Sequence, residues 1–460
     1  MSWTPRIAAD SLPLYVAIAD AIADDAESGR LAPGTRMPTH RALATALGVD
    51  VTTVSRAYAE ATRRGLIAGH VGRGTYVRGA RPPLIAARSA AMVDLTVNLP
   101  PEPSDACDAA MRKTLGELSR SADIASLLTY APFGGSMAHR EAGAGWCVDR
   151  GVAASAARVL VSGGAQQAVI SVLSAHCEPG DTVITEALTY PGFLAAIRAL
   201  RLRAVGAPLD EDGIVPEGLA RLAKTTRAKV LLATPTLQNP TGTIMPAGRR
   251  RRIAAVIRER GLTLVEDDVY APLVPESPRP LASLVPELSY FVSSFSKAIT
   301  PALRTAFLVA PSASAAARLT PHIQATGWMS APLMTEVACR WITSGVVASI
   351  IAERRAEASA RQAILREQLG LPPDAGSAHA FHHWLELPRQ WERASVFVEA
   401  LRARGVLVTS GDAFAVEGTT PSRAVRVSLG AAPSRDALAR ALETLSVVLR
   451  EDPEPVRPAR

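Results

Sequence analysis

Cysteine is scarce in this chain, and its four cysteines lie far apart: Cys107, Cys147, Cys177 and Cys339. No C-x-x-C pair occurs, so the sequence has neither the ligand spacing of a zinc site nor the framework of a disulfide-rich fold. We therefore expect no metal site and a reducing, cytoplasmic environment.

Long apolar runs are also missing. The longest uncharged stretch, residues 159–177, is interrupted by serine, glycine and glutamine, whereas a membrane-spanning helix needs about 20 apolar residues. The N-terminus, MSWTPRIAAD, lacks the basic segment and the following apolar segment of a signal peptide. These absences predict a chain that is neither exported nor inserted in a membrane.

Length and composition predict two independent bodies. The chain has 460 residues, and a single hydrophobic core stops growing at roughly 250–300 residues. Hydrophobic residues make up 48% and charged residues 20%, as in ordinary soluble proteins. The net charge of +7 and the pI near 9.5 favour an anionic partner, although so small an excess can also serve solubility alone.

Residues 11–78 show a helical pattern that is broken by turn residues. Apolar side chains recur every four positions over residues 14–22, which predicts a first helix ending at Gly29. Thr39 and Asp50 are good N-caps, so each predicts the start of a further helix. Three short helices in this order are typical of a helix-turn-helix, whose last helix fits the major groove of DNA.

The third predicted helix has one apolar face, formed by Val54, Ala57, Tyr58 and Ala61. Its opposite face carries Thr52, Thr53 and Arg56, which are free to meet DNA. Residues 66–77 predict a β-hairpin with one cation near its tip, a form that suits contact with a phosphate or the minor groove. The pattern alone is equally compatible with a three-helix bundle that exposes a solvated charged face.

Resemblance to a known family favours the DNA-binding interpretation. The stretch from Pro13 to Val77, PLYVAIADAIADDAESGRLAPGTRMPTHRALATALGVDVTTVSRAYAEATRRGLIAGHVGRGTYV, resembles the winged-helix domain of the GntR regulators over its whole length. The resemblance implies binding to double-stranded DNA. By motif it implies DNA contacts by Arg41, Thr52, Thr53 and His70, and by position it adds Ser55, Arg56 and Arg73.

The rest of the chain divides into a connector, a large body and a tail. Residues 79–103 are rich in proline and alanine without a sustained period, so they predict a linker. Residues 104–450 alternate helical segments with compact apolar runs, and residues 451–460 contain three prolines and predict a flexible tail. The predicted strands of the body are residues 159–161, 182–185, 229–233, 263–266, 290–293 and 306–309.

This alternation predicts a mostly parallel sheet that is covered by helices on both faces. Ligands of such sheets bind at the carboxyl ends of the strands. The segment after Leu319 mixes long helices with apolar runs near residues 381–387, 406–408 and 425–428, which predicts a smaller α/β lobe. We expect the ligand cleft between the two lobes.

The stretch Ser293-Ser294-Phe295-Ser296-Lys297 follows an apolar run and precedes Arg304 by seven residues, as in an anchor for pyridoxal 5'-phosphate. This cofactor needs an amine for an aldimine, a carboxylate at its pyridine nitrogen, donors for its phosphate and a group over its ring. Lys297 is the candidate catalytic amine. Candidates for the phosphate are Ser294, Ser296 and Arg304, together with the turn Gly164-Ala165-Gln166, where a strand leads into a helix.

The remaining cofactor candidates also follow predicted strands. Tyr190 can stack on the cofactor ring, and Asn239 in an Asn-Pro-Thr-Gly turn can bond the phenolic oxygen O3'. Asp267 can pair with the pyridine nitrogen, and Tyr270 can reach O3'. Each residue has a plainer explanation, such as a core tyrosine, a surface turn or a solvated acidic turn, but their joint occurrence in chain order favours the cofactor.

Residues 104–450 resemble a fold-type I aminotransferase of the aspartate aminotransferase class. The resemblance implies a PLP-dependent transferase fold with a large, mostly parallel α/β domain and a small α/β lobe. It implies that Tyr130 reaches the phosphate held by a partner subunit, which requires a homodimer. It also implies that Arg426 binds the α-carboxylate of a substrate or effector.

With both halves present, the chain resembles the MocR subfamily of GntR regulators, which fuse a winged helix to an aminotransferase-like body. We therefore expect a nucleoid-associated transcriptional regulator that binds a promoter with two half-sites. It would sense pyridoxal phosphate, an amine or an amino acid through aldimine chemistry at Lys297, without steady turnover. The alternatives are an active aminotransferase with an accessory DNA-binding module and a repressor with a decayed, cofactor-free pocket.

Overall fold

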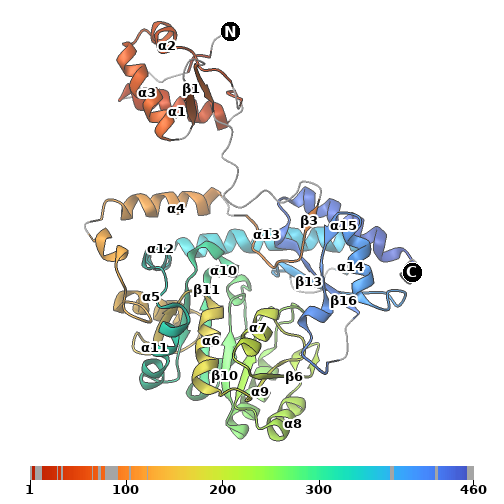
Figure 1. The fold of residues 1–460 in the computed structure, drawn as a ribbon. Coiled ribbons are helices and arrows are strands. Elements are labelled where there is room, and N and C mark those ends of the chain that lie inside the picture. Colours follow the sequence, from red (N-terminus) through yellow and green to blue (C-terminus); the bar gives the residue numbers. More distant parts are fainter. Residues whose placement is uncertain are drawn as a thin grey trace. The chain divides into compact units, whose positions relative to one another are not determined.

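The computed structural model of the chain separates into two compact units, Met1–Ala90 and Ala91–Arg460 (Figure 1). We describe each unit by itself. The residues that the structure describes are 3–5, 13–27, 30–32, 35–64, 66–70, 74–77, 92–102, 105–121, 123–372, 378–419 and 423–452.

The first unit is a winged helix-turn-helix. Its helices are α1 (Leu14–Glu27), α2 (His40–Leu47) and α3 (Val51–Arg63), followed by an antiparallel hairpin of β1 (Ile67–His70) and β2 (Gly74–Val77). The predicted caps are present, since Thr39 accepts a hydrogen bond from the backbone N–H of Ala42 and Asp50 accepts one from that of Thr52. The predicted end of the first helix at Gly29 and the tip of the predicted hairpin lie outside the described residues.

The centre of the second unit is a seven-stranded sheet with the strand order β4-β12-β11-β10-β9-β5-β6. All its neighbouring strands are parallel except β12, which runs antiparallel to both β11 and β4. Its strands are β4 (Val159–Ser162), β5 (Thr182–Glu186), β6 (Arg203–Ala207), β9 (Val230–Ala233), β10 (Thr263–Asp267), β11 (Ser289–Ser294) and β12 (Ala306–Val309).

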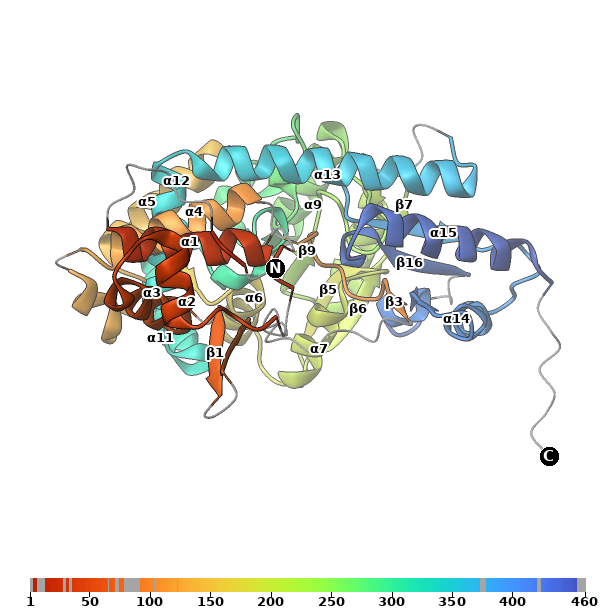
Figure 2. The ribbon, with the colours of Figure 1, turned by 90° about the horizontal axis from the view of Figure 1, so that it is seen from above.

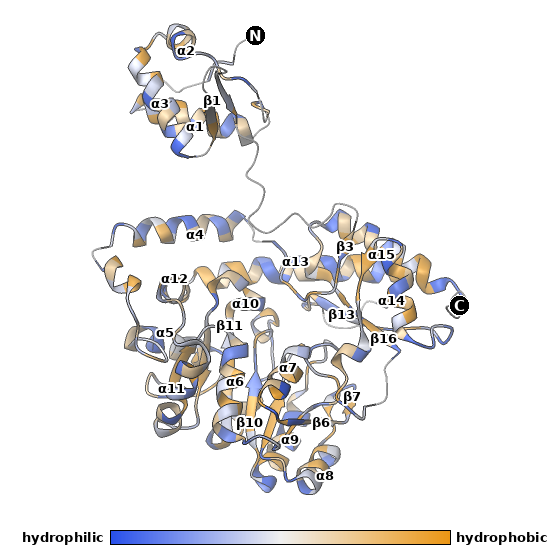
Figure 3. Ribbon diagram, in the orientation of Figure 1, coloured by the Kyte–Doolittle hydropathy of each residue, from blue (hydrophilic) through white to orange (hydrophobic). Residues whose placement is uncertain are grey.

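Helices cover both faces of this sheet, as the alternation of segments predicted. One apolar cluster packs the strands against α6 (Ala165–His176), α7 (Pro191–Ala199) and α11 (Ala313–Gly327). The other cluster packs them against α5 (Met137–Asp149), α8 (Pro216–Thr226), α9 (Ala247–Arg260), α12 (Pro332–Thr343) and α4 (Asp105–Leu118). Figure 3 shows hydrophobic colouring in strands of this sheet, and the residues of the central strand β10 after Thr263 are all buried.

The small lobe is built on a second sheet. Its strands are β13 (His382–Glu386), β16 (Ala424–Ser428) and β15 (Thr409–Ser410), with the helices α14 (Ala394–Arg402) and α15 (Arg435–Arg450). The long helix α13 (Val346–Leu369) lies beside α15 (Figure 2). A minor hairpin of β7 (Leu209–Asp210) and β8 (Gly213–Ile214) completes the strands of the large domain.

The predicted linker is too long at its C-terminal end. Val93–Asp94 forms β3, which pairs in parallel with β14 (Val406–Leu407) of the small lobe, and the second unit begins at Ala91. Leu95 is fully buried in the core of this lobe. The pairing partner of β3 is more than 300 residues away in sequence, so no local pattern reveals it.

Within the described residues, no single helix combines the length and apolarity needed to cross a bilayer. Helices α12 and α13 meet at a sharp bend, and only together are they long and apolar enough to span a bilayer. Buried core helices of soluble proteins can have the same length and composition.

Candidate cofactor site

A pocket of about 230 Å³ lies at the carboxyl ends of the central strands, where the alternating pattern predicted a ligand. Ten of the predicted cofactor residues line it. They are Ala165, Gln166, Tyr190, Asn239, Asp267, Tyr270, Ser294, Ser296, Lys297 and Arg304, accompanied by Leu99, Phe193, Thr234, Val269 and Pro301.

Lys297 lies on the short helix α10 (Phe295–Ala298), which begins directly after β11. The Ser294 hydroxyl caps this helix by accepting a hydrogen bond from the Ser296 N–H. The Lys297 Nζ donates to the backbone oxygen of Asn98 at 2.5 Å. Burial, with a smaller contribution from the Arg426 and Arg304 cations, lowers the pKa of Lys297 to about 8. A substantial fraction of this amine is therefore neutral near pH 8 and able to attack a carbonyl.

Asp267 ends β10 and is buried at the wall of the pocket. Burial, reinforced by the neighbouring Asp268, raises the pKa of Asp267 to about 8. Its Oδ1 has no hydrogen-bond partner among the described residues, which is costly for a buried carboxylate. A protonated ring nitrogen would supply both the missing donor and the missing charge, so the residue fits a pyridinium.

The two acids that flank Asp267 in the sequence are engaged in other contacts. Glu266 accepts hydrogen bonds from the backbone N–H groups of Leu281 and Ala282. Asp268 pairs with Arg150 at 3.2 Å. Of the three consecutive acids, only Asp267 lines the pocket.

The start of α6, which the sequence predicts to bind the phosphate, lines one part of the pocket with Ala165 and Gln166. Gly164 has φ = 119°, a conformation that favours glycine, and it precedes the first residue of the helix. The Arg304 Nη2 donates to the backbone oxygen of Gly163 at 2.8 Å, which places the guanidinium beside the free N–H groups of the helix. Together with Ser294 and Ser296, these groups are the donors that a phosphate requires.

Replacing Gly164 by alanine tests whether the start of α6 and Arg304 bind the phosphate. A Cβ at this position would lie 2.7 Å from Arg304 Nη2, and the backbone would be strained as well. We expect Gly164→Ala to weaken the binding of pyridoxal phosphate by about tenfold, measured by absorbance titration. Gly145→Ala is the control, because nothing lies within 4 Å of its added carbon. If both variants bind pyridoxal phosphate with equal affinity, the phosphate does not bind at the start of α6.

Tyr190 and the O3' candidates Asn239 and Tyr270 line the same pocket. The Tyr190 ring lies so close to Gly192 that a Cβ there would be 2.2 Å from it. The Tyr270 hydroxyl accepts hydrogen bonds from Asn98 Nδ2 at 3.0 Å and from Asn239 Nδ2 at 3.4 Å. Burial raises the pKa of Tyr270, so this side chain stays protonated and able to donate.

Arg426 lies on β16 and reaches the same site from the small lobe. Its Nη1 donates to Asn239 Oδ1 at 2.9 Å and its Nη2 donates to the backbone oxygen of Thr96 at 2.5 Å. Its guanidinium also lies 4.7 Å from the centre of the Phe414 ring. The Nε is buried without a partner among the described residues. Arg426 contacts Asn239 of the pocket but is not itself among the residues that line it.

Tyr130 does not line the pocket of this single chain. Its side chain is 78% exposed and its ring lies 5.9 Å from that of Trp328. The residues that the sequence missed are chiefly Asn98, which lies in the segment assigned to the linker, and His382, which bonds to it at 3.0 Å. No motif distinguishes either of them from an ordinary polar residue.

The predicted DNA contacts lie on the first unit. Arg41 and Thr52 are exposed on the first turns of α2 and α3. Ser55 is partly buried and bonds to His40 at 3.1 Å, while the Arg56 guanidinium lies 4.3 Å from the centre of the Tyr15 ring. Thr53 is half-buried. His70 ends β1 with its side chain outside the described part, and Arg73 lies outside the described residues.

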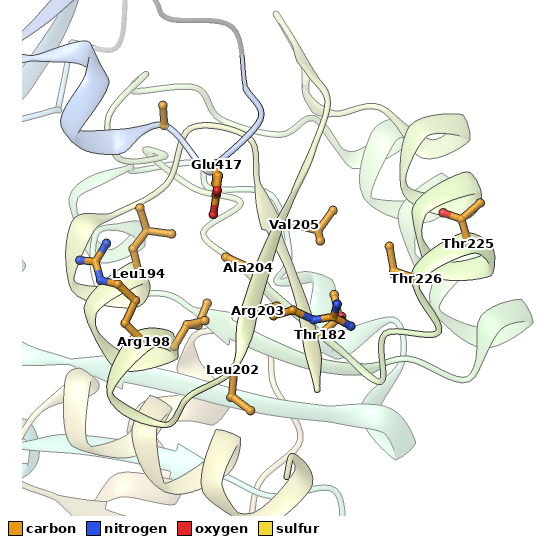
Figure 4. Close-up of a pocket in the computed structure, with 12 residues that line it drawn as sticks. Thr182, Leu194, Arg198, Leu202, Arg203, Ala204, Val205, Thr225, Thr226 and Glu417 are labelled. Atoms are coloured by element: carbon orange, nitrogen blue, oxygen red, sulfur yellow. The ribbon is translucent and has the colours of Figure 1, made fainter. Parts of the chain in front are cut away.

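A larger hollow of about 710 Å³ lies beside the edge strand β6 (Figure 4). It carries Arg198 and Arg203 with the hydroxyls of Thr182, Thr225 and Thr226, and Glu417 lies at its rim. None of the predicted cofactor residues lines it. Size alone therefore does not locate the cofactor site.

Comparison with known families agrees with this geometry. Residues 90–445 match the family model described as Aminotransferase class I and II. The chain belongs to this aminotransferase family. Residues 14–77 match the model of the bacterial regulatory proteins of the gntR family. The order of the two domains confirms the predicted MocR organisation, and the chain is a transcriptional regulator with a PLP-binding, aminotransferase-like domain.

Two transcriptional regulators match this chain over most of its length. The HTH-type transcriptional regulator YdeF of Bacillus subtilis is 28% identical over 454 residues, which cover 98% of this chain and 97% of the relative. The vitamin B6 salvage pathway transcriptional repressor PtsJ of Salmonella typhimurium is 27% identical over 422 residues, which cover 90% and 93%.

Solved aminotransferases share the fold of the second unit. LysN, an alpha-aminoadipate aminotransferase from Thermus thermophilus in complex with N-(5'-phosphopyridoxyl)-L-leucine, is 25% identical with a TM-score of 0.68 and covers 78% of this chain and 92% of its own. A kynurenine aminotransferase from Pyrococcus horikoshii, 22% identical with a TM-score of 0.72, covers 80% and 93%. The predicted fold is confirmed, and pyridoxal phosphate is the cofactor of this domain.

Proposed function

We propose that this regulator holds pyridoxal phosphate on Lys297 and that its DNA binding responds to the cofactor itself, to an amine or to an amino acid. The observation that carries the proposal is the convergence in one pocket of a reactive lysine and a buried aspartate whose Oδ1 has no partner among the described residues. The similarity to PtsJ, a repressor of vitamin B6 salvage, supports this class of effector.

In this proposal each side chain has a distinct task. When bound, pyridoxal phosphate supplies an aldehyde that combines reversibly with amines. Lys297 attaches the cofactor and can yield its place to an incoming amine. Asp267 keeps the ring nitrogen protonated, while Arg304 and the start of α6 hold the phosphate. Arg426 receives the carboxylate of an amino acid through its planar guanidinium.

We propose that the chain acts as a homodimer through the face that carries Tyr130. Large apolar side chains are exposed there, namely Leu128, Tyr130, Met137 and Trp328. Trp328 also contacts Phe133, with 5.3 Å between the ring centres. Covering this patch with a second copy would remove apolar surface from water and would bring Tyr130 toward the partner's phosphate site. Two winged helices would then read two half-sites of a promoter on the nucleoid.

The completeness of the pocket favours one alternative, an active aminotransferase that carries a DNA-binding module. Product formation and DNA binding distinguish the two functions. Protein loaded with pyridoxal phosphate is mixed with an amino acid and a keto acid, and its binding to its own promoter is measured in parallel.

For a regulator we expect the amino acid to change promoter affinity by about fivefold or more. New amino acid would form in no more than one equivalent per chain. Many equivalents of product with unchanged promoter affinity would establish the aminotransferase instead.

A further inference from the structure

Asn98 and His382 form a buried polar chain behind Tyr270. Asn98 Nδ2 lies 3.0 Å from the Tyr270 hydroxyl and 3.0 Å from His382 Nδ1. His382 Nε2 lies 3.0 Å from the backbone oxygen of Gln238. Asn98 and His382 are 5% and 1% exposed, so these groups satisfy one another rather than water.

The positions of the hydrogens in this series of hydrogen bonds follow from the groups that can act only as donor or only as acceptor. The Gln238 oxygen is a backbone carbonyl, which only accepts, so His382 Nε2 must carry the hydrogen. Burial, with the cationic Arg426 as a smaller cause, lowers the pKa of His382 to about 3, so the ring is neutral. His382 Nδ1 is then an acceptor, and the Asn98 amide must turn its NH2 group toward it.

The second hydrogen of the Asn98 NH2 group points to Tyr270. Asn239 reinforces this arrangement, because its Oδ1 accepts a hydrogen bond from Arg426, an obligate donor. The Asn239 NH2 group is thereby also directed to the Tyr270 oxygen, at 3.4 Å. With two amide donors on its oxygen, the Tyr270 hydroxyl has to direct its own hydrogen elsewhere. Its side chain lines the cofactor pocket.

We propose that Asn98 and His382 are positioning residues that orient the Tyr270 hydroxyl as a hydrogen-bond donor into the cofactor pocket. This inference rests on the proposed function, because the acceptor is the phenolic oxygen O3' of pyridoxal phosphate held on Lys297. The titratable groups whose charges act on Tyr270 are Arg426, Asp267 and Tyr190. The carbonyl of Asn98 also accepts from the Lys297 amine, so one residue contacts both groups that hold the cofactor.

The inference predicts a change in the pH titration of the cofactor absorbance. A hydrogen bond from Tyr270 stabilises the ionised form of O3', so its loss should raise the midpoint of the titration. We expect Asn98→Leu and His382→Leu each to raise this midpoint by about half a pH unit or more. His382→Gln should restore the wild-type midpoint, because glutamine also presents one donor and one acceptor.

Two further variants separate positioning from a general structural effect. In a Tyr270→Phe background, Asn98→Leu should produce no additional shift. His383→Leu is the matched control, because neighbouring residues of a strand face opposite sides and His383 has no hydrogen bond to Tyr270 or Asn98 among the described contacts. Melting temperatures verify that each variant is folded.

The possible outcomes distinguish this inference from the proposed function. If the wild-type chain takes up no pyridoxal phosphate, both fail. If it takes up the cofactor but the midpoints of Asn98→Leu and His382→Leu equal that of the wild type, only the positioning role is overturned. A shift in Asn98→Leu that persists in the Tyr270→Phe background also overturns it.

Discussion

Lys297→Ala should abolish the visible absorption band that pyridoxal phosphate gives when attached to the wild-type chain. The substitution removes the only lysine among the residues that line the pocket. Arg304, Asp267 and the start of α6 would still bind the cofactor, but without a covalent bond. We expect the apparent affinity to fall roughly 100-fold, as measured by absorbance titration.

The chain offers a clear control for this substitution. It contains four lysines, Lys113, Lys224, Lys229 and Lys297. Lys229 is exposed and pairs with Asp181 at 3.1 Å, so Lys229→Ala should retain the full band. Borohydride reduction followed by mass spectrometry should place one pyridoxyl group on Lys297. A pyridoxyl group on Lys229, or an unchanged band in Lys297→Ala, would contradict the proposed anchor.

Much of the pocket was predictable because its residues follow strands. A parallel sheet brings the ends of distant strands to one edge, so Asn239 after β9, Asp267 at the end of β10 and Lys297 after β11 meet there. Each is preceded by an apolar run that marks a buried strand. The order of these residues along the chain therefore carries information about their proximity in space.

The edge strand β6 could not be recognised in the same way. Its sequence, Arg203-Ala204-Val205-Gly206-Ala207, has one strongly β-forming residue and pairs on one side with β5. Only Ala207 of this strand is buried. A half-exposed strand without alternation leaves no periodic pattern to detect.

The role of Asn98 was hidden for a different reason. Its neighbours Val93–Asp94 pair with β14, and its own partners Tyr270 and His382 are 172 and 284 residues away. Proline and alanine in the preceding segment suggested a connector that continued to residue 103. Such a contact depends on how the small lobe packs against the large domain, and that packing cannot be predicted from the local sequence.

Replacing Arg41 and Thr52 together should reduce the affinity for the promoter by about 100-fold at physiological salt. Arg41 is an exposed cation on the first turn of α2, where it can neutralise a phosphate. The Thr52 hydroxyl donates to Asp50 at 2.6 Å, which leaves its oxygen free to accept from a base edge. The affinity of Arg41→Ala/Thr52→Val is measured by gel retardation, with the cofactor band as a test of the second unit.

Arg63→Ala provides the comparison for this variant. Arg63 lies at the other end of α3, is exposed, and pairs with Glu60 at 2.6 Å, so it should contribute little to groove recognition. We expect Arg41→Ala alone to reduce the steepness of a plot of log affinity against log salt concentration by about one. If Arg63→Ala weakens promoter binding as strongly as the double variant, α3 does not enter the groove by its N-terminal end. Binding would then depend on net charge rather than on the predicted contacts.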